Sequence, residues 1–388
     1  MPRFEWVTAG ESHGKGLTAV VSGVPAGLPL EAKHVNVDLA RRQKGYGRGG
    51  RMKIESDAVE FLAGVRAGVA LGSPISMWIQ NRDWKNWSQI MSPEPDAVTD
   101  RRTLTRPRPG HADLVGGLKY NHQDLRNVLE RASARETAAR SAVGGIAKRL
   151  LDEFNIQIFS AVLQIGPVKA DVDVNALESN AEFDDSPLRC PDKEAEQKMM
   201  EYINQRQRNG DTCGGVAAVV ARGVPPGLGS HTAWNRKLDG RIAQAMMSIQ
   251  AIKGVSIGEG MRVAGVPGSE AHDEIFYDDA RRAFYRKTNR AGGLEGGVTN
   301  GMPVVALIAM KPISTLARPL QSVDIQTKEP FIAQKERTDS CAVPAAGIVG
   351  EAMMAIVLAT AFLQKFGGDS LSEMKRNVDG YLEYARNF

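Results

Sequence analysis

Cysteine is scarce in this chain of 388 residues, which contains only Cys190, Cys213 and Cys341. The three lie far apart and form no CxxC pair, so the sequence predicts neither a disulfide framework nor a zinc knuckle, and we expect no metal site. This usage is typical of a reducing compartment. The first ten residues, MPRFEWVTAG, contain no apolar run of the kind found in secretory signals, and we expect a cytoplasmic protein.

The net charge is also low, and aromatic side chains are few. The 49 Lys and Arg residues are nearly balanced by 45 Asp and Glu, leaving +4, and aromatics make up 6% of the chain. Both values argue against nucleic-acid binding, which pairs a basic surface with interleaved aromatics, although residues 45–51 (GYGRGGR) are similar to Arg/Gly-rich RNA-binding segments. The 42% of hydrophobic residues is instead typical of a globular protein with a large core.

Long apolar runs are nearly absent. Residues 341–363 carry a single charge, Glu351, and could be mistaken for a membrane span. Pro344, Glu351 and the many small residues favour a helix buried in the protein core instead, and we expect no membrane partner.

One pattern occurs twice along the chain. Residues 18–22 (TAVVS) read as a short buried strand that ends at the turn 23–28 (GVPAGL), and residues 217–221 (AAVVA) lead into 223–228 (GVPPGL). A helix is predicted after each turn, over 30–42 and 236–249. Two further helices, 133–154 and 345–366, are alike in having small residues first and apolar ones later.

These recurrences predict an α+β fold made of two similar halves, roughly 1–165 and 210–366. The alternative is chance recurrence of a common turn. The polar stretch 178–205 is expected to be a surface excursion plus a helix, not a linker, so residues 1–388 form one domain.

Arginine gathers in three places, two of them rich in glycine or proline: residues 40–53, residues 101–111, and the group Arg131, Arg135 and Arg140. Arg131 and Arg135 are expected one helical turn apart on the same face. The arginine fork suits phosphate and carboxylate, and glycine lets backbone N–H groups approach an anion. The clusters therefore predict a small-molecule polyanionic substrate, although solvated surface is the alternative for each cluster taken singly.

Three other residues are candidates for chemistry. His13 lies between glycines, and His111 follows Pro109-Gly110, so both rings are accessible and could move a proton near neutral pH. Asp339 precedes the buried helix, where it could belong to an anion site or cap the helix. Cys341 is expected to be a buried thiol and not a nucleophile.

Five blocks of the chain, in order, resemble the signatures of chorismate synthases. They are residues 10–14 (GESHG) with 17–25 (LTAVVSGVP), 106–113 (RPRPGHAD), 130–137 (ERASARET), 289–297 (NRAGGLEGG), and 337–352, which begin RTDSC. The likeness runs from Thr8 to about Phe366, and five blocks in one order are far more specific than a single block. Small departures from the family pattern occur at Ala132, Gln250, Ser314 and Thr338, and none of them removes a catalytic group.

The resemblance implies a β-α-β sandwich, with central helices between antiparallel sheets and an internal duplication, assembled as a homotetramer. It implies reduced FMN as the cofactor and 1,4-elimination of phosphate from 5-enolpyruvylshikimate 3-phosphate, without net redox change, to give chorismate. NADPH is a candidate reductant. Because the sequence shows no separate reductase domain, an external flavin reductase is the expected partner. The rival interpretations are a differently acting flavoprotein on the same fold and an RNA-binding protein.

The resemblance also implies roles for single residues. His111 matches the acid that protonates the departing phosphate, His13 the group that protonates the reduced flavin, and Asp339 the acceptor of the proton relayed through the flavin N5 region. Arg42 and Arg48 match positions for NADPH or substrate phosphate, and Ser12, Ser133, Arg48 and Arg135 are expected to contact substrate. The flavin positions are Arg131, Ala132, Ser133, Gln250, Ala251, Gly296, Lys311, Pro312, Ile313, Ser314, Thr315 and Arg337.

Overall fold

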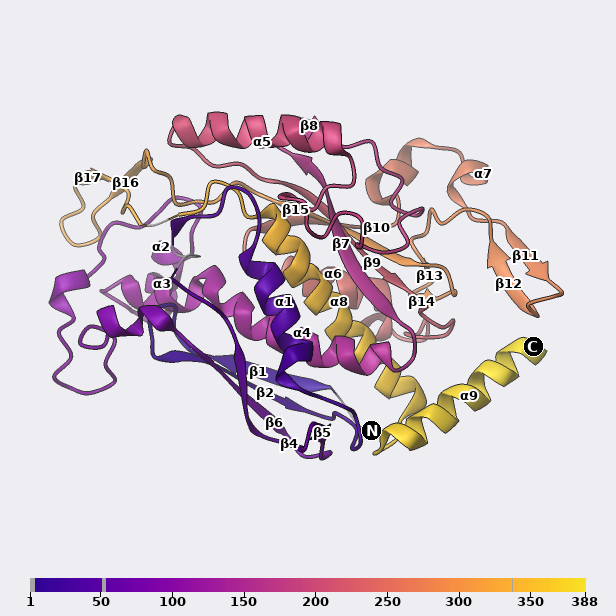
Figure 1. Cartoon of the computed structure of the whole chain (residues 1–388). Coiled ribbons are helices and arrows are strands. Elements are labelled where there is room, and N and C mark those ends of the chain that lie inside the picture. The colour runs from indigo at the N-terminus through magenta and orange to yellow at the C-terminus, as the bar shows by residue number, and fades with distance from the viewer. Residues whose placement is uncertain (1–3, 51–53, 337) are drawn as a thin grey trace.

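Two antiparallel sheets and a set of long helices build the molecule (Figure 1), a computed structural model that describes residues 4–50, 54–336 and 338–388. The first sheet has the strand order β1-β2-β6-β3: β1 (Glu5–Ala9), β2 (Gly16–Ser22), β6 (Ile75–Gln80) and β3 (Val59–Ala63). The second has the order β10-β15-β9-β7-β8: β10 (Ile252–Ile257), β15 (Val304–Met310), β9 (Gly215–Arg222), β7 (Gln157–Ile165) and β8 (Val168–Lys169). The expected α+β class is confirmed.

The central helices pack against one another and lie mainly against one sheet each, although α4 also contacts β7 of the second sheet. Helices α1 (Ala32–Gln43) and α4 (Thr137–Asp152) contact the first sheet, and α6 (Leu238–Met247) and α8 (Val343–Phe366) contact the second. Helices α4 and α8 approach closely, since a Cβ added to Gly144 would lie 2.3 Å from the Cβ of Ala352. Glycine at this point allows the two helix backbones to touch.

Helix α8 is the predicted core helix. It begins after Ala342 with Pro344 in its first turn, where proline fits because no backbone donor is needed. It is long and apolar enough to cross a membrane, but 94% of its most apolar stretch is buried inside the protein, so the core interpretation is confirmed.

The single charge of α8 is neutralised by distant parts of the chain. Glu351 is fully buried and accepts hydrogen bonds from Arg41 (2.7 Å), Lys148 (2.6 Å) and Ser160 (2.7 Å). Burial alone would raise the pKa of Glu351, yet the surrounding cations lower it to about 2. We call the following group the Glu351 cluster: Asp38, Arg41, Lys148, Asp184, Arg189 and Glu351.

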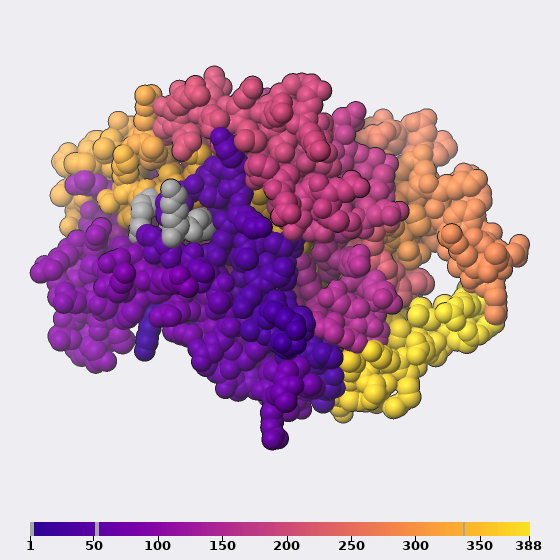
Figure 2. All heavy atoms as spheres, in the orientation of Figure 1, coloured from indigo at the N-terminus to yellow at the C-terminus, as the bar shows by residue number. Residues whose placement is uncertain are grey.

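The remaining elements are mostly peripheral. The helices are α2 (Asp113–Tyr120), α3 (Arg126–Ala132), α5 (Lys193–Arg208), α7 (Gly268–Ala271) and α9 (Leu371–Asn387), with 3-10 turns η2 (Arg82–Asn86), η3 (Asp100–Arg102), η4 (Ala134–Glu136), η5 (Trp234–Arg236) and η6 (Gly260–Gly265). The short strands are β4 (Val65–Arg66), β5 (Val69–Ala70), β11 (Ile275–Asp278), β12 (Ala283–Arg286), β13 (Leu294–Glu295), β14 (Val298–Thr299), β16 (Gln321–Val323) and β17 (Pro330–Ile332). Figure 2 shows α9 and the β11–β12 hairpin standing out from one end of the body.

The predicted strands 18–22 and 217–221 are confirmed as parts of β2 and β9, and the predicted helices as α1, α6, α4 and α8. The polar stretch 178–205 consists of turns followed by α5, also as expected. One prediction was wrong. Ser133 has extended backbone angles that end α3, so Arg131 and Arg135 lie on separate elements and do not share a helical face.

Candidate active site

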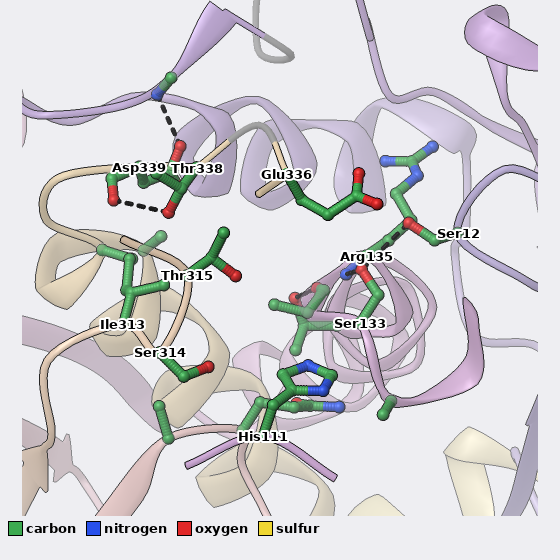
Figure 3. A pocket seen from close by; sticks show the side chains of 18 of the residues that line it. Ser12, His111, Ser133, Arg135, Ile313, Ser314, Thr315, Glu336, Thr338 and Asp339 are labelled. Carbon is green, nitrogen blue, oxygen red and sulfur yellow. Dashed lines mark hydrogen bonds between the residues drawn. The ribbon is translucent and has the colours of Figure 1, made fainter. Parts of the chain in front are cut away.

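A cavity of about 430 Å³ lies where α4 and α8 begin. This volume is in the range of ~300–1,000 Å³ typical of small-molecule sites. All the predicted site residues line the cavity except Arg131, Gly296, Pro312 and Arg337. The close view in Figure 3 shows labelled side chains from both ends of the chain, including Ser12, His111 and Asp339, arranged around one space.

The four exceptions differ in kind. Arg131 is exposed and donates hydrogen bonds to the carbonyl oxygens of Thr8 (2.8 Å) and Gly10 (3.3 Å). Gly296 forms the turn between β13 and β14, and Pro312 lines a smaller neighbouring pocket of about 280 Å³. Arg337 lies outside the described residues.

His13 is held by a buried carboxylate. Its Nδ1 lies 2.9 and 3.1 Å from the two carboxylate oxygens of Glu130, and its backbone N–H donates to Glu130 at 2.7 Å. Its ring stacks on Trp87 with a centroid separation of 4.0 Å. Burial would raise the pKa of Glu130, but the hydrogen bonds from His13 outweigh it and the pKa is lowered. Glu130 and Trp87 therefore fix the orientation of the His13 ring, with Nδ1 turned toward Glu130.

His111 has an equivalent support. Its Nδ1 lies 2.6 Å from Asp113, a fully buried carboxylate that also accepts a hydrogen bond from Nε of Arg108 at 2.8 Å. Nη2 of Arg108 lies 3.1 and 3.3 Å from the two ring nitrogens of His111. Burial opposes ionisation of Asp113, yet the hydrogen bonds from His111 and Arg108 hold its pKa well below the usual range.

One carboxylate serves two buried arginines of the cavity wall. Asp57 accepts hydrogen bonds from Arg42 (2.6 Å) and Arg135 (2.5 Å). Burial, together with the positive charges of Arg135 and Arg48, lowers the pKa of Arg42 to about 10 in spite of Asp57. Nη2 of Arg135 also lies 3.8 Å from Glu55, a second buried carboxylate, so the two arginines face two carboxylates in a medium of low dielectric.

Three buried polar atoms of the wall are unused. Nε of Arg42, Nη2 of Arg135 and Oε1 of Gln250 have no hydrogen-bond partner among the described residues. Buried polar groups without partners cost free energy, so such atoms on a cavity wall point to a polar ligand. These three come from α1, η4 and the end of α6, and a single ligand would have to span both halves of the chain to reach them.

Asp339 joins the glycine-rich segment after α1 to the start of α8. It accepts a hydrogen bond from the backbone of Gly49 (2.6 Å) and pairs with Arg48 at 3.1 Å. A Cβ on Gly49 would lie 2.4 Å from the carbonyl oxygen of Thr338, so only glycine fits this approach. The N-cap of α8 is Ala342, without a side-chain cap, and the alternative role of Asp339 as a cap is wrong.

Two hydroxyls connect the walls. Oγ of Ser12 donates to Oγ of Ser133 at 3.0 Å, and Ser133 caps η4 by accepting from the backbone of Arg135. The N-termini of α4 and α8 both face the cavity, through Thr137 and Ala345 respectively, and add partial positive charge.

Sequence reasoning missed the residues that support the histidines. Asp113 was detectable, because it lies two positions after His111 in the same block, and Arg108 belongs to the second arginine cluster. Glu130 and Trp87 carry no such signal, since their contact with His13 joins segments about 120 and 70 residues apart. In the described part of the chain, no three His, Cys, Asp or Glu side chains gather to hold a metal ion.

The arrangement joins two carboxylate-anchored histidines to an anion-binding wall, as an enzyme acting on a small charged molecule requires. The family model described as chorismate synthase matches residues 4–363. The chorismate synthase of Desulforamulus reducens is 57% identical and that of Aquifex aeolicus 54% identical, each over 99% of both chains. A crystal structure of a chorismate synthase superposes with a TM-score of 0.80 at 44% identity, covering 100% of this chain and 99% of the other.

The chain belongs to the chorismate synthase family, and it is a lyase. The reaction known for this family is the 1,4-elimination of phosphate from 5-enolpyruvylshikimate 3-phosphate to give chorismate, a step of aromatic biosynthesis.

Proposed function

We propose that the 430 Å³ cavity holds reduced FMN and 5-enolpyruvylshikimate 3-phosphate side by side and eliminates phosphate there without net redox change. The observation that carries this proposal is the pair of buried arginines Arg42 and Arg135, whose Nε and Nη2 atoms, respectively, have no hydrogen-bond partner among the described residues. The substrate carries a phosphate and two carboxylates, and FMN carries a further phosphate, so the ligands supply acceptor oxygens for these donors.

The residues present fit a flavin. Gln250 offers an unused carbonyl oxygen to an N–H donor, and Ala251 and Ile313 provide apolar wall beside it. Lys311 lines the same side of the cavity and donates to the carbonyl of Gly110. Reduced FMN, when bound, supplies electron density as the C–O bond breaks and recovers it as the C6 hydrogen leaves.

His111 protonates the departing phosphate. Asp113 fixes its ring through Nδ1, which leaves Nε2 to carry the proton toward the ligand. Arg108 adds positive charge within 3.3 Å of the ring, so a phosphate arriving at His111 also meets a guanidinium. Phosphate is a better leaving group when protonated and paired with a cation, and both groups are held by one buried carboxylate.

His13 and Asp339 carry out the other proton transfers, and two serines bind the substrate beside them. Glu130 and Trp87 orient His13, which would supply a proton to the reduced flavin when it is bound, and Asp339 would accept the proton that leaves by way of the flavin. Ser12 and Ser133, whose hydroxyl groups are hydrogen-bonded to each other at 3.0 Å, both contact the substrate. Arg48, paired with Asp339, belongs to the phosphate-binding or NADPH-binding wall.

The two halves are an internal duplication. In each half a first strand pairs with a second strand, and the second strand runs through a Gly-Val-Pro turn into a helix and two further strands. The antiparallel order is the same in both halves: β1-β2-β6-β3 and β7-β9-β15-β10, with β8 added beside β7 in the second. Gly23 and Gly223 have similar left-handed φ values of 82° and 76°. The proposed halves were 1–165 and 210–366, and the pairing of β7 with β9 favours opening the second half at Gln157 instead.

Assembly, location and reductant follow the family. The β11–β12 hairpin exposes Ile275, Tyr277 and Phe284 at the end of the molecule seen beside α9 in Figure 2, and such a patch suits burial in a homotetramer. The protein works in the cytoplasm, with reduced FMN supplied by an external flavin reductase. Activity with NADPH and oxidised FMN, compared with photoreduced FMN, tests the last point.

The deciding experiment mixes the protein anaerobically with photoreduced FMN and 5-enolpyruvylshikimate 3-phosphate and follows chorismate absorbance. His111→Ala is expected to slow turnover by roughly 10²–10⁴, the range for losing a general acid. His272→Ala, which removes an exposed histidine remote from the cavity lining, is the matched control and should turn over at the wild-type rate. Turnover of His111→Ala within a few-fold of wild type would show that His111 has another role.

A further inference from the structure

Two of the three cysteines lie side by side next to the active-site cavity. Cys213 precedes β9 and Cys341 precedes α8, and both are almost completely buried, at 2% and 0% exposed. The backbone N–H of Cys213 donates to the carbonyl of Ser340 at 2.9 Å, and its Sγ lies 3.5 Å from the same oxygen. Cys341 directly follows Ser340 in the chain, and its side chain interacts with that of Cys213.

One of the two thiols lines the smaller of the two pockets described above. Cys213 lines the neighbouring 280 Å³ pocket together with Gln164, Tyr202 and Thr212, whereas Cys341 lines neither cavity. A small reagent entering this pocket therefore meets Cys213 first. The hydrogen bond with Cys341 lowers the pKa of Cys213, while the same bond and burial raise the pKa of Cys341, so Cys213 is the better thiolate.

We propose that Cys213 and Cys341 are a redox-sensitive dithiol that closes to a disulfide when hydrogen peroxide reaches the smaller pocket. The Cys213 thiolate attacks one peroxide oxygen, the O–O bond breaks, and Cys213 becomes a sulfenic acid as hydroxide leaves and takes up a proton. Sγ of Cys341 then attacks Sγ of Cys213, the S–O bond breaks and a second water leaves. In total two thiols and one peroxide give one disulfide and two waters.

The disulfide would act on the wall of the active site through a short stretch of backbone. The N–H groups of Ser340 and Cys341 both donate to the carbonyl of Gly47, at 2.8 and 3.3 Å. Asp339 is held two residues before Cys341 by Gly49 and Arg48. Moving Cys341 toward Cys213 would displace the backbone of residues 339–341 relative to Gly47, and would thereby shift the Asp339–Arg48 pair.

The packing leaves little freedom to absorb that pull. A Cβ on Gly47 would lie 3.0 Å from the Cβ of Cys341, so the cysteine side chain already rests against the glycine-rich segment. A misplacement of about 1 Å in a catalytic site can cost ~10²-fold in rate, and we expect oxidation to lower turnover by at least about tenfold. Reduction by dithiothreitol should restore it.

The test treats the wild-type protein with hydrogen peroxide, removes the peroxide with catalase, and then maps disulfides by peptide mass spectrometry and counts free thiols. A 213–341 disulfide and a fall from the three thiols of the chain to one are expected. Cys213→Ser and Cys341→Ser should keep their turnover after peroxide. Cys190→Ser is the matched control, because Cys190 is buried, bonds to the carbonyl of Asp192 and should leave the switch intact.

Several outcomes would overturn the proposal. They are three free thiols after peroxide, a sulfinic acid on Cys213 without a disulfide, or a disulfide that leaves turnover unchanged. Thiol counting and disulfide mapping do not depend on the reaction assigned to the cavity, so they stand even where that assignment fails. Cys213→Ala serves as a second variant if the serine substitution prevents folding.

Discussion

The Glu351 cluster predicts a large and measurable stability effect. It contains three cations and three carboxylates, so its formal charge is zero: Arg41, Lys148 and Arg189 against Asp38, Asp184 and Glu351. Glu351→Gln keeps the shape of the side chain and leaves one buried cation without a counter-charge. Breaking a buried ion pair by removing one partner costs about 3–5 kcal/mol.

The pKa of Glu351 gives an independent magnitude. A fall from 4.5 to about 2 corresponds to ~3 kcal/mol of stability, at about 1.4 kcal/mol per pKa unit. Because the folded pKa is lower than the unfolded one, this stability is fully present above pH 4.5 and is lost as pH falls toward 2. Glu351→Gln should therefore be less stable at neutral pH and should lack this acid-dependent loss.

Urea unfolding at pH 7 and at pH 4, at one fixed protein concentration, measures both effects. Glu194→Gln is the matched control, since Glu194 pairs with Lys198 on the surface and its loss should change the free energy of unfolding by less than about 0.5 kcal/mol. A Glu351→Gln protein within about 1 kcal/mol of wild type would refute the idea that the cluster is charge-balanced and desolvated.

Two further predictions test packing and the site. Gly144→Ala should destabilise the protein by about 1–3 kcal/mol or more in thermal or urea unfolding, because the new methyl group meets Ala352. Gly240→Ala, on the exposed start of α6, is the control and should be neutral or slightly stabilising, because its methyl group meets nothing within 4 Å. Equal effects of the two substitutions would contradict the close α4–α8 contact. Asp113→Asn should lower turnover by up to roughly 10²–10⁴ with little change in circular dichroism, since it removes the carboxylate that fixes His111. It should also remove a stability contribution that wild type loses only as pH falls below about 4, the usual pKa of aspartate, because the folded pKa of Asp113 is lowered. Wild-type turnover in this variant would argue against the anchoring role.

Local pattern was sufficient for much of the fold. The run around Glu351 predicted α8, and the repeated Gly-Val-Pro turns predicted β2 and β9 with the helices that follow them, because these signals lie within a few residues. The break at Ser133 was not predicted, although serine is a residue that favours the start of a helix. The pairing of β7 with β9 was not predicted, because it joins strands separated by about 50 residues of chain.

The candidate site was likewise predicted in part. Family resemblance located about half of the residues that line the cavity, including Gln250 and Ala251, for which residue chemistry alone gave no signal. The partners that tune the site were beyond local reasoning. Asp57 between Arg42 and Arg135, and Trp87 behind His13, come together only through tertiary contacts between distant segments.

The span of the cavity wall, from Ser12 to Val349, bears on how the protein acquires its activity during synthesis. A nascent chain that ends before Asp339 lacks this carboxylate and the start of α8 that closes the wall, although most of its sheets and helices are already complete. The ligand site is thus among the last features to form. Ligand binding therefore reports that the whole polypeptide has been made and folded, and a truncated product would be structured in part yet catalytically silent.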